Sequence, residues 1–96
     1  MKNLLNDAEL KDAQNLLPDW EVSGELLFRV FLFKNFVEAF DFMTAISSTA
    51  EEMNHHPDWA NVYNKVEVRL STHDSGGVTS LDVQLASIMD SLFTED

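Results

Sequence analysis

The sequence contains no cysteine in its 96 residues. That absence excludes disulfide bonds, thiolate zinc sites and cysteine nucleophiles. Long apolar runs are also missing, because the most apolar stretch, residues 26–43, is interrupted by charged side chains and is shorter than the roughly 20 apolar residues of a membrane span. The first residues lack the apolar run and cleavage site of a secretory signal. We therefore expect a cytoplasmic protein that does not interact with membranes.

Basic residues are scarce, with six Lys and Arg against seventeen Asp and Glu and a formal net charge of −11. Such a charge repels the phosphate backbone of nucleic acids and anionic lipid surfaces. We expect no direct binding of nucleic acid, and we interpret the excess of acids as a well-solvated surface.

The length and the 45% hydrophobic content are sufficient for one ordinary core. A second domain would have no core of its own. The sequence therefore predicts a single domain over residues 1–96.

The first third of the chain predicts a helix followed by a hairpin. Asn6 and Glu9 form a capping box in front of a helix over residues 7–16, which Pro18 ends. Residues 20–22 and 25–33 alternate like strands around a Ser23-Gly24 turn. Both faces of residues 25–33 are mainly apolar, which indicates that one face is buried against another subunit.

The remainder predicts a long helix, a strand region and a last helix. The long helix starts at Phe36 and ends near His55, with its apolar stripe at Phe36, Ala39, Phe40, Met43, Ile46, Ala50 and Met53. Residues 59–72 are rich in strand formers and can be split by a turn near residues 64–65, with an alternating apolar face at Val62, Val66, Val68 and Leu70. Residues 73–77 form a loop because two adjacent glycines weaken regular structure.

A second capping box, Thr79 with Asp82, starts the last helix. Its buried stripe is predicted at Leu81, Leu85, Ile88, Met89 and Leu92, and residues 94–96 should fray. The resulting order is α-β-β-α-β(β)-α. This order indicates an α+β fold with an antiparallel sheet and its helices on one face.

The three histidines, His55, His56 and His73, lie at predicted ends of a helix and of a strand, where sites are usually built. Histidine changes its charge near neutral pH, so one ring can donate a proton while another accepts one. Pro57 breaks the helix and frees the first two rings from the divergent directions of regular structure. Glu51 lies one turn before His55 and could orient its imidazole.

Each of these residues also has a plainer interpretation. The His-His-Pro segment is compatible with a polar helix C-cap, and Asp82 is explained by capping alone. Trp59 and the nearby Tyr63 could flank a planar ligand or simply belong to a core or an interface. Three histidines and Glu51 could in principle bind zinc, but the adjacent pair and the absence of a second helical pair argue against it, so we expect no metal site.

The spacing Glu51-x3-His55-His56-Pro57-x5-Tyr63-x9-His73-x8-Asp82 resembles the signature of the pterin-4a-carbinolamine dehydratases. Similarity extends through Phe40-x-Phe42-Met43, residues 61–66 and residues 70–73, and covers roughly residues 20–90. Asn54 departs from the Asp that some members carry at its position, and Leu81 departs from the Arg of some animal members.

The resemblance implies a four-stranded antiparallel sheet with three helices packed on one face, in the order α-β-β-α-β-β-α, assembled as a homodimer or homotetramer. It implies dehydration of 4a-hydroxytetrahydropterin to quinonoid dihydropterin, in tetrahydropterin recycling, with neither metal nor bound cofactor. By position, His55 and His73 are the acid/base pair and His56 mainly holds the pterin. Substrate or imidazole is then oriented by Glu51, Asn54, Trp59 and Asp82.

Animal members of this family also act as coactivators that bind a homeodomain transcription factor. The alternative to an enzyme is therefore a non-enzymatic module that binds another protein. That alternative assigns no chemistry to the three histidines.

Overall fold

Capping side chains set the start of each helix in the computed structural model, which describes residues 3–93. Helix α1, Asp7–Leu16, begins at the predicted capping box, where the amide of Glu9 donates to Asn6 Oδ1 at 2.8 Å. Helix α3, Ser80–Leu92, begins at the second predicted box. Helix α2, Phe36–Met53, is capped by Asn35, whose side chain accepts a bond from the amide of Glu38.

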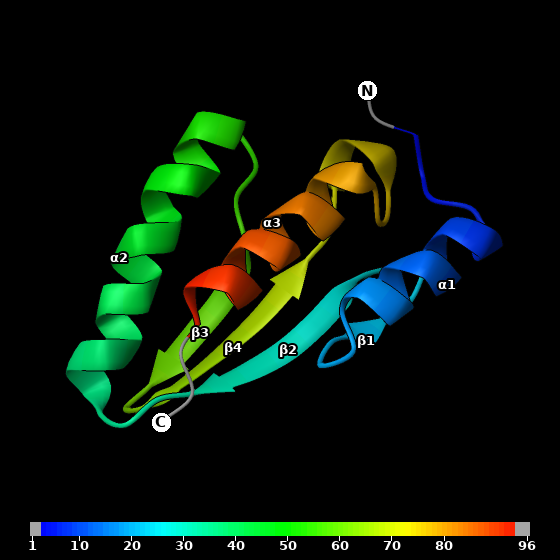
Figure 1. Cartoon of the computed structure of the whole chain (residues 1–96). Coiled ribbons are helices and arrows are strands. Elements are labelled where there is room, and N and C mark those ends of the chain that lie inside the picture. Colours follow the sequence, from blue (N-terminus) through cyan, green and yellow to red (C-terminus); the bar gives the residue numbers. More distant parts are fainter. Residues whose placement is uncertain (1–2, 94–96) are drawn as a thin grey trace.

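The four strands form one antiparallel sheet in the order β1-β2-β4-β3. The predicted hairpin is confirmed as β1, Glu21–Val22, and β2, Leu27–Leu32. The strand region after α2 is split as expected, into β3, Asp58–Val62, and β4, Lys65–Leu70. All three helices cover one face of the sheet (Figure 1), so the predicted fold class and element order are confirmed.

The core lies between the sheet and the helices. Strand β2 contributes Leu27 and Phe31, which are paired with Leu70 and Val66 of β4 and are fully buried. Phe31 is the centre of an aromatic cluster, with the ring of Phe42 at 4.9 Å between centroids. Burial of this apolar surface is the main favourable term in folding.

The predicted apolar stripe of α2 is partly wrong. Phe36 and Phe40 are about half exposed and contact each other, while Phe42 is buried in the core with Ile46. The exposed pair, Phe36 and Phe40, and the buried pair, Phe42 and Ile46, are both spaced by one helical turn, because α2 is apolar on more than one side. The small side chain of Ala39 lies on the buried side and lets the helix approach the sheet closely.

Two other predicted core positions are exposed. Val62 is 67% exposed because it pairs with Lys65 across the turn and so lies on the outer face of the sheet. Leu92 is 48% exposed at the end of α3, and Ala86 is buried instead. The predicted fraying of residues 94–96 lies outside the described residues.

The outer face of the sheet is less apolar than β2 alone suggests. Phe28 of β2 pairs with Arg69 of β4, whose guanidinium lies 5.0 Å from the centre of the ring. Leu32 pairs with Lys65 and is 61% exposed. The face therefore alternates apolar side chains of one strand with charged side chains of its neighbour.

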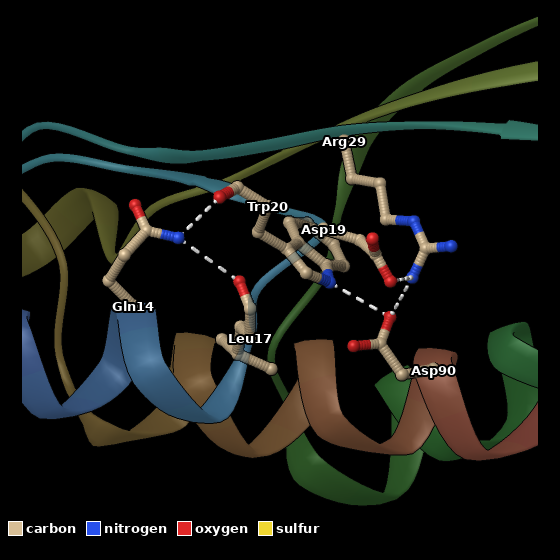
Figure 2. Close-up of polar contacts among 6 residues, drawn as sticks. All are labelled: Gln14, Leu17, Asp19, Trp20, Arg29 and Asp90. Carbon is tan, nitrogen blue, oxygen red and sulfur yellow. Dashed lines mark hydrogen bonds and ion pairs between the residues drawn. The ribbon is translucent and has the colours of Figure 1, made fainter.

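A polar cluster ties α3 to the strand side of the fold (Figure 2). Asp90 Oδ1 accepts a hydrogen bond from Trp20 Nε1 at 2.8 Å and another from Arg29 Nη1 at 2.6 Å. The guanidinium of Arg29 also lies 4.2 Å from the centre of the Phe31 ring, and Asp19 approaches it at 3.8 Å. Arg29 is thus a charged residue on the core face with both an acidic and an aromatic partner.

Within residues 3–93, no helix combines the length and the apolar character that crossing a membrane requires.

Candidate functional site

The end of α2 presents the first two histidines. The helix ends at Met53, and Asn54 adopts a left-handed backbone conformation with φ of 51° while its amide donates to the carbonyl of Ala50. This conformation is a common helix C-terminus and turns the chain sharply. His55 and His56 therefore leave the helix axis before Pro57. The end of the helix has two causes, the left-handed backbone of Asn54 and the predicted effect of Pro57.

The third histidine is presented by a tight turn after β4. His73 begins a 3-10 turn, His73–Ser75, inside the segment predicted to be a loop. Thr72 and Gly77 close the segment as an isolated β-bridge. Gly76 has φ of 78°, a conformation that glycine adopts without strain.

All three histidines line one cleft of about 640 Å³, although His73 is distant from the other two along the chain. The cleft lies between the end of α2, the turn after β4 and the start of α3. Its lining residues are Asn54, His55, His56, Ser71, Thr72, His73, Asp74, Ser75 and Leu81. A second hollow of about 450 Å³ shares His56, Ser71 and His73 with it. A volume of this order is typical of small-molecule sites.

His55 is held by a buried carboxylate. Its Nε2 lies 2.6 Å from Oδ1 of Asp82, and the exposed fractions of the two side chains are 8% and 0%. The other oxygen of Asp82 accepts the amide of Thr79 at 2.9 Å as part of the capping box. Both predicted roles of Asp82, as a helix cap and as a partner of the imidazole, are thus compatible, since one oxygen caps α3 and the other binds His55.

Glu51 is bonded to His56 and not to His55, so the predicted pairing is wrong. Its Oε1 lies 2.6 Å from His56 Nε2, and the two side chains are 79% and 57% exposed. One-turn spacing favours His55 only while the helix continues. The left-handed Asn54 redirects the chain and brings the next residue within reach of Glu51.

The remaining predicted site residues differ in position. Asn54 lines the cleft. Trp59 is half-buried in β3, where it packs against the core, and neither it nor Tyr63 is among the lining residues. In the described part of the chain, no group of three or more His, Asp or Glu side chains is placed to hold a metal ion.

Sequence reasoning predicted the Thr79 cap beside Asp82 but missed the hydroxyl of Thr72. Thr72 Oγ1 donates to Asp82 Oδ2 at 2.8 Å and lies 2.6 Å from Thr79 Oγ1. Both threonines are buried. The only signal in the sequence is that Thr72 directly precedes His73 at the end of a strand.

The cleft can carry out proton transfer between two different imidazoles. His55 is buried and fixed against a carboxylate, while His73 is exposed and borders the same cavity. A ring held by a carboxylate keeps a defined orientation and is stabilised when it becomes charged. One histidine can therefore accept a proton from a bound molecule while another donates one.

The chain is similar to known proteins in both sequence and fold. Residues 3–92 match the family model described as Pterin 4 alpha carbinolamine dehydratase. Relatives named as pterin-4-alpha-carbinolamine dehydratases include one from Bradyrhizobium diazoefficiens, 51% identical over 94 residues (96% of this chain and 94% of the relative). Another, from Synechococcus sp. strain WH7803, is 50% identical over 92 residues (96% of this chain and 99% of the relative). A crystal structure described as transcriptional coactivator/pterin dehydratase from Brucella melitensis superposes with a TM-score of 0.88 at 43% identity, covering 93% of this chain and 97% of that one.

Proposed function

Because this chain belongs to the pterin-4-alpha-carbinolamine dehydratase family, we propose that it dehydrates 4a-hydroxytetrahydropterin to quinonoid dihydropterin and water. The observation that carries the proposal is the convergence of His55, His56 and His73 on one cleft from two separate segments. The reaction would take place in the cytoplasm, as part of tetrahydropterin recycling.

The chemistry of this dehydration matches what the cleft offers. The hydroxyl at C4a leaves as water once its oxygen receives a proton, and the proton on N5 is removed as the C4a=N5 double bond forms. Carbon and nitrogen undergo no net redox change, so the step needs an acid and a base and requires neither a metal nor an organic cofactor. We assign the acid/base pair to His55 and His73.

The environments of the three rings support separate roles. The Asp82 carboxylate fixes the orientation of the His55 ring. A fixed ring is expected of a group that transfers a proton to or from a bound substrate. His56 is exposed and bonded to Glu51, so we assign both to holding the pterin at the mouth of the cleft. Asn54 at the cleft wall is assigned to the same task, while Trp59 would reach a substrate only if the ligand extends towards β3.

The assay follows dehydration by ultraviolet absorbance and compares the wild type with His73→Ala and His55→Ala. Each substitution should lower kcat by roughly 10² to 10⁴, which is the usual contribution of a positioned acid or base. His73→Ala is the sharper test because this ring is exposed. Lys34→Ala, at an exposed position between β2 and α2, is the control and should keep full activity. Full activity in both histidine variants would refute the assignment.

We also propose that the protein assembles as a homodimer or homotetramer. Large apolar side chains are exposed on α2, on β2 and at the β3–β4 turn, namely Val30, Leu32, Phe36, Val37, Phe40, Val62 and Tyr63. Strand β3 is an edge of the sheet and has a free hydrogen-bonding side within the described chain. Phe36 and Phe40 contact each other on α2 beside Val37, and an exposed apolar patch of this kind commonly marks a contact between proteins.

A binding module without catalysis is the second candidate, because the similar Brucella melitensis structure is described as a transcriptional coactivator as well as a pterin dehydratase. The same exposed apolar residues would then bind a different protein. Failure of the wild type to accelerate the spontaneous dehydration would favour this candidate. Acceleration that disappears in His73→Ala would favour the enzyme.

A further inference from the structure

Thr72 directly precedes His73 and is bonded both to the turn that carries His73 and to Asp82, the partner of His55. Its side chain is buried and donates to Asp82, the partner of His55. Its backbone carbonyl accepts the amides of Ser75 and Gly76, each at 3.0 Å, and so closes the turn that begins at His73. One residue therefore contacts the supports of both proposed acid/base groups.

The hydrogen bonds around Thr72 can run in only one direction. A hydroxyl has one proton to donate, and Thr72 gives its proton to Asp82 Oδ2. The 2.6 Å contact between the two threonine hydroxyls must then use the proton of Thr79. Thr79 Oγ1 in turn accepts the amide of Leu81 at 3.3 Å. The chain of donors is therefore fixed from the first turn of α3 to the carboxylate.

The carboxylate that Thr72 supports determines which nitrogen of His55 carries the proton. A carboxylate accepts hydrogen bonds and donates none, so the 2.6 Å contact to Asp82 requires a proton on Nε2 of His55. Among the described residues, every buried side-chain nitrogen or oxygen has a hydrogen-bond partner. The contact to Asp82 is the one side-chain bond of His55 in that set, so Nδ1 reaches the surface of the cleft. In the neutral ring, Nδ1 is then the nitrogen that can accept a proton.

We infer that Thr72 is a positioning residue for the reaction: through Asp82 it holds His55 as the tautomer protonated at Nε2, with Nδ1 facing the pterin. The inference rests on the proposed function for its catalytic consequence but not for the tautomer itself. Without the hydroxyl, Asp82 keeps the amide of Thr79 as its only donor at Oδ2 and is held less firmly. The orientation and the tautomer of His55 would then be less strictly fixed.

The test compares Thr72→Val, which removes the hydroxyl at nearly constant shape, with Thr72→Ser, which keeps it. Nitrogen-15 NMR of the imidazole rings reports the tautomer of each histidine in the free protein, and only three histidines need assignment. Steady-state kinetics on the same samples gives kcat and KM. Thr44→Val, an exposed threonine of α2, is the matched control.

In the wild type and in Thr72→Ser we expect the His55 signal of a ring protonated at Nε2. In Thr72→Val we expect a mixture of tautomers and a fall in kcat of roughly tenfold to a hundredfold, with KM changed less than about twofold. Thr44→Val should match the wild type. An unchanged tautomer and unchanged kcat in Thr72→Val would overturn the inference. A wild type without dehydratase activity would refute the proposed function, and the tautomer measurement would still decide the role of Thr72.

Discussion

Replacing Asp82 by Ala should destabilise the protein far more than removal of a helix cap alone. Asp82 occupies the third position of α3, where its Oδ2 caps the amide of Thr79. It also accepts bonds from the Thr72 hydroxyl and from His55 Nε2, and its own side chain is fully buried. The substitution therefore removes a cap and leaves two buried donors without their acceptor.

The expected loss follows from those three contacts. A lost cap costs about 1 kcal/mol, and each buried donor without a partner costs about 1–3 kcal/mol. The free energy of unfolding should fall by roughly 3–7 kcal/mol, a large share of the roughly 5–15 kcal/mol that is usual for a domain. Urea denaturation followed by circular dichroism measures this difference directly.

Glu9 provides a matched control in the same chain. It occupies the same position in the capping box of α1 but is exposed and has no second task in that box. Glu9→Ala should therefore lose only a small fraction of what Asp82→Ala loses. Equal, small losses in the two variants would show that Asp82 is a cap and nothing more, and would refute the argument that it holds His55.

Three other changes give separate predictions. Asp90→Ala leaves the largely buried guanidinium of Arg29 without its 2.6 Å partner and should lower the free energy of unfolding by roughly 2–4 kcal/mol in thermal or urea unfolding; an unchanged midpoint contradicts this. Phe40→Glu puts a charge into the exposed apolar patch of α2 and should reduce the molar mass measured by light scattering to that of one chain, whereas an unchanged mass rules out α2 as the contact. Gly77→Ala would place its Cβ 2.5 Å from the carbonyl oxygen of Gly24, which forces the backbone to shift and should cost about 1–3 kcal/mol; wild-type stability in this variant would show that the close approach is easily relieved.

The sequence predicted best those features that depend on neighbours along the chain. The capping boxes at Asn6 and Thr79 and the hairpin after Trp20 involve contacts within a few residues, so local chemistry determines them. The choice of the buried side of α2 could not be predicted in this way. Phe40 and Phe42 both satisfy a helical stripe, and only the position of Phe31 in the sheet decides between them.

The same distinction holds for the site. The three histidines were predicted from residue type and spacing, and the structure places them on one cleft. Their partners depend on backbone and tertiary geometry: Glu51 is bonded to His56 because Asn54 turns the chain, and the Thr72 hydroxyl reaches Asp82 from another segment. Spacing along the chain contains no information on either contact.

We propose that histidines from two segments of the chain surround one bound pterin. Titration of the nitrogen-15 labelled protein with a dihydropterin that cannot be dehydrated tests it directly, because each imidazole gives its own signals. We predict that the ring signals of His55, His56 and His73 all shift with one common dissociation constant. Saturation of the protein with pterin while the signals of His73 stay in place would contradict the account.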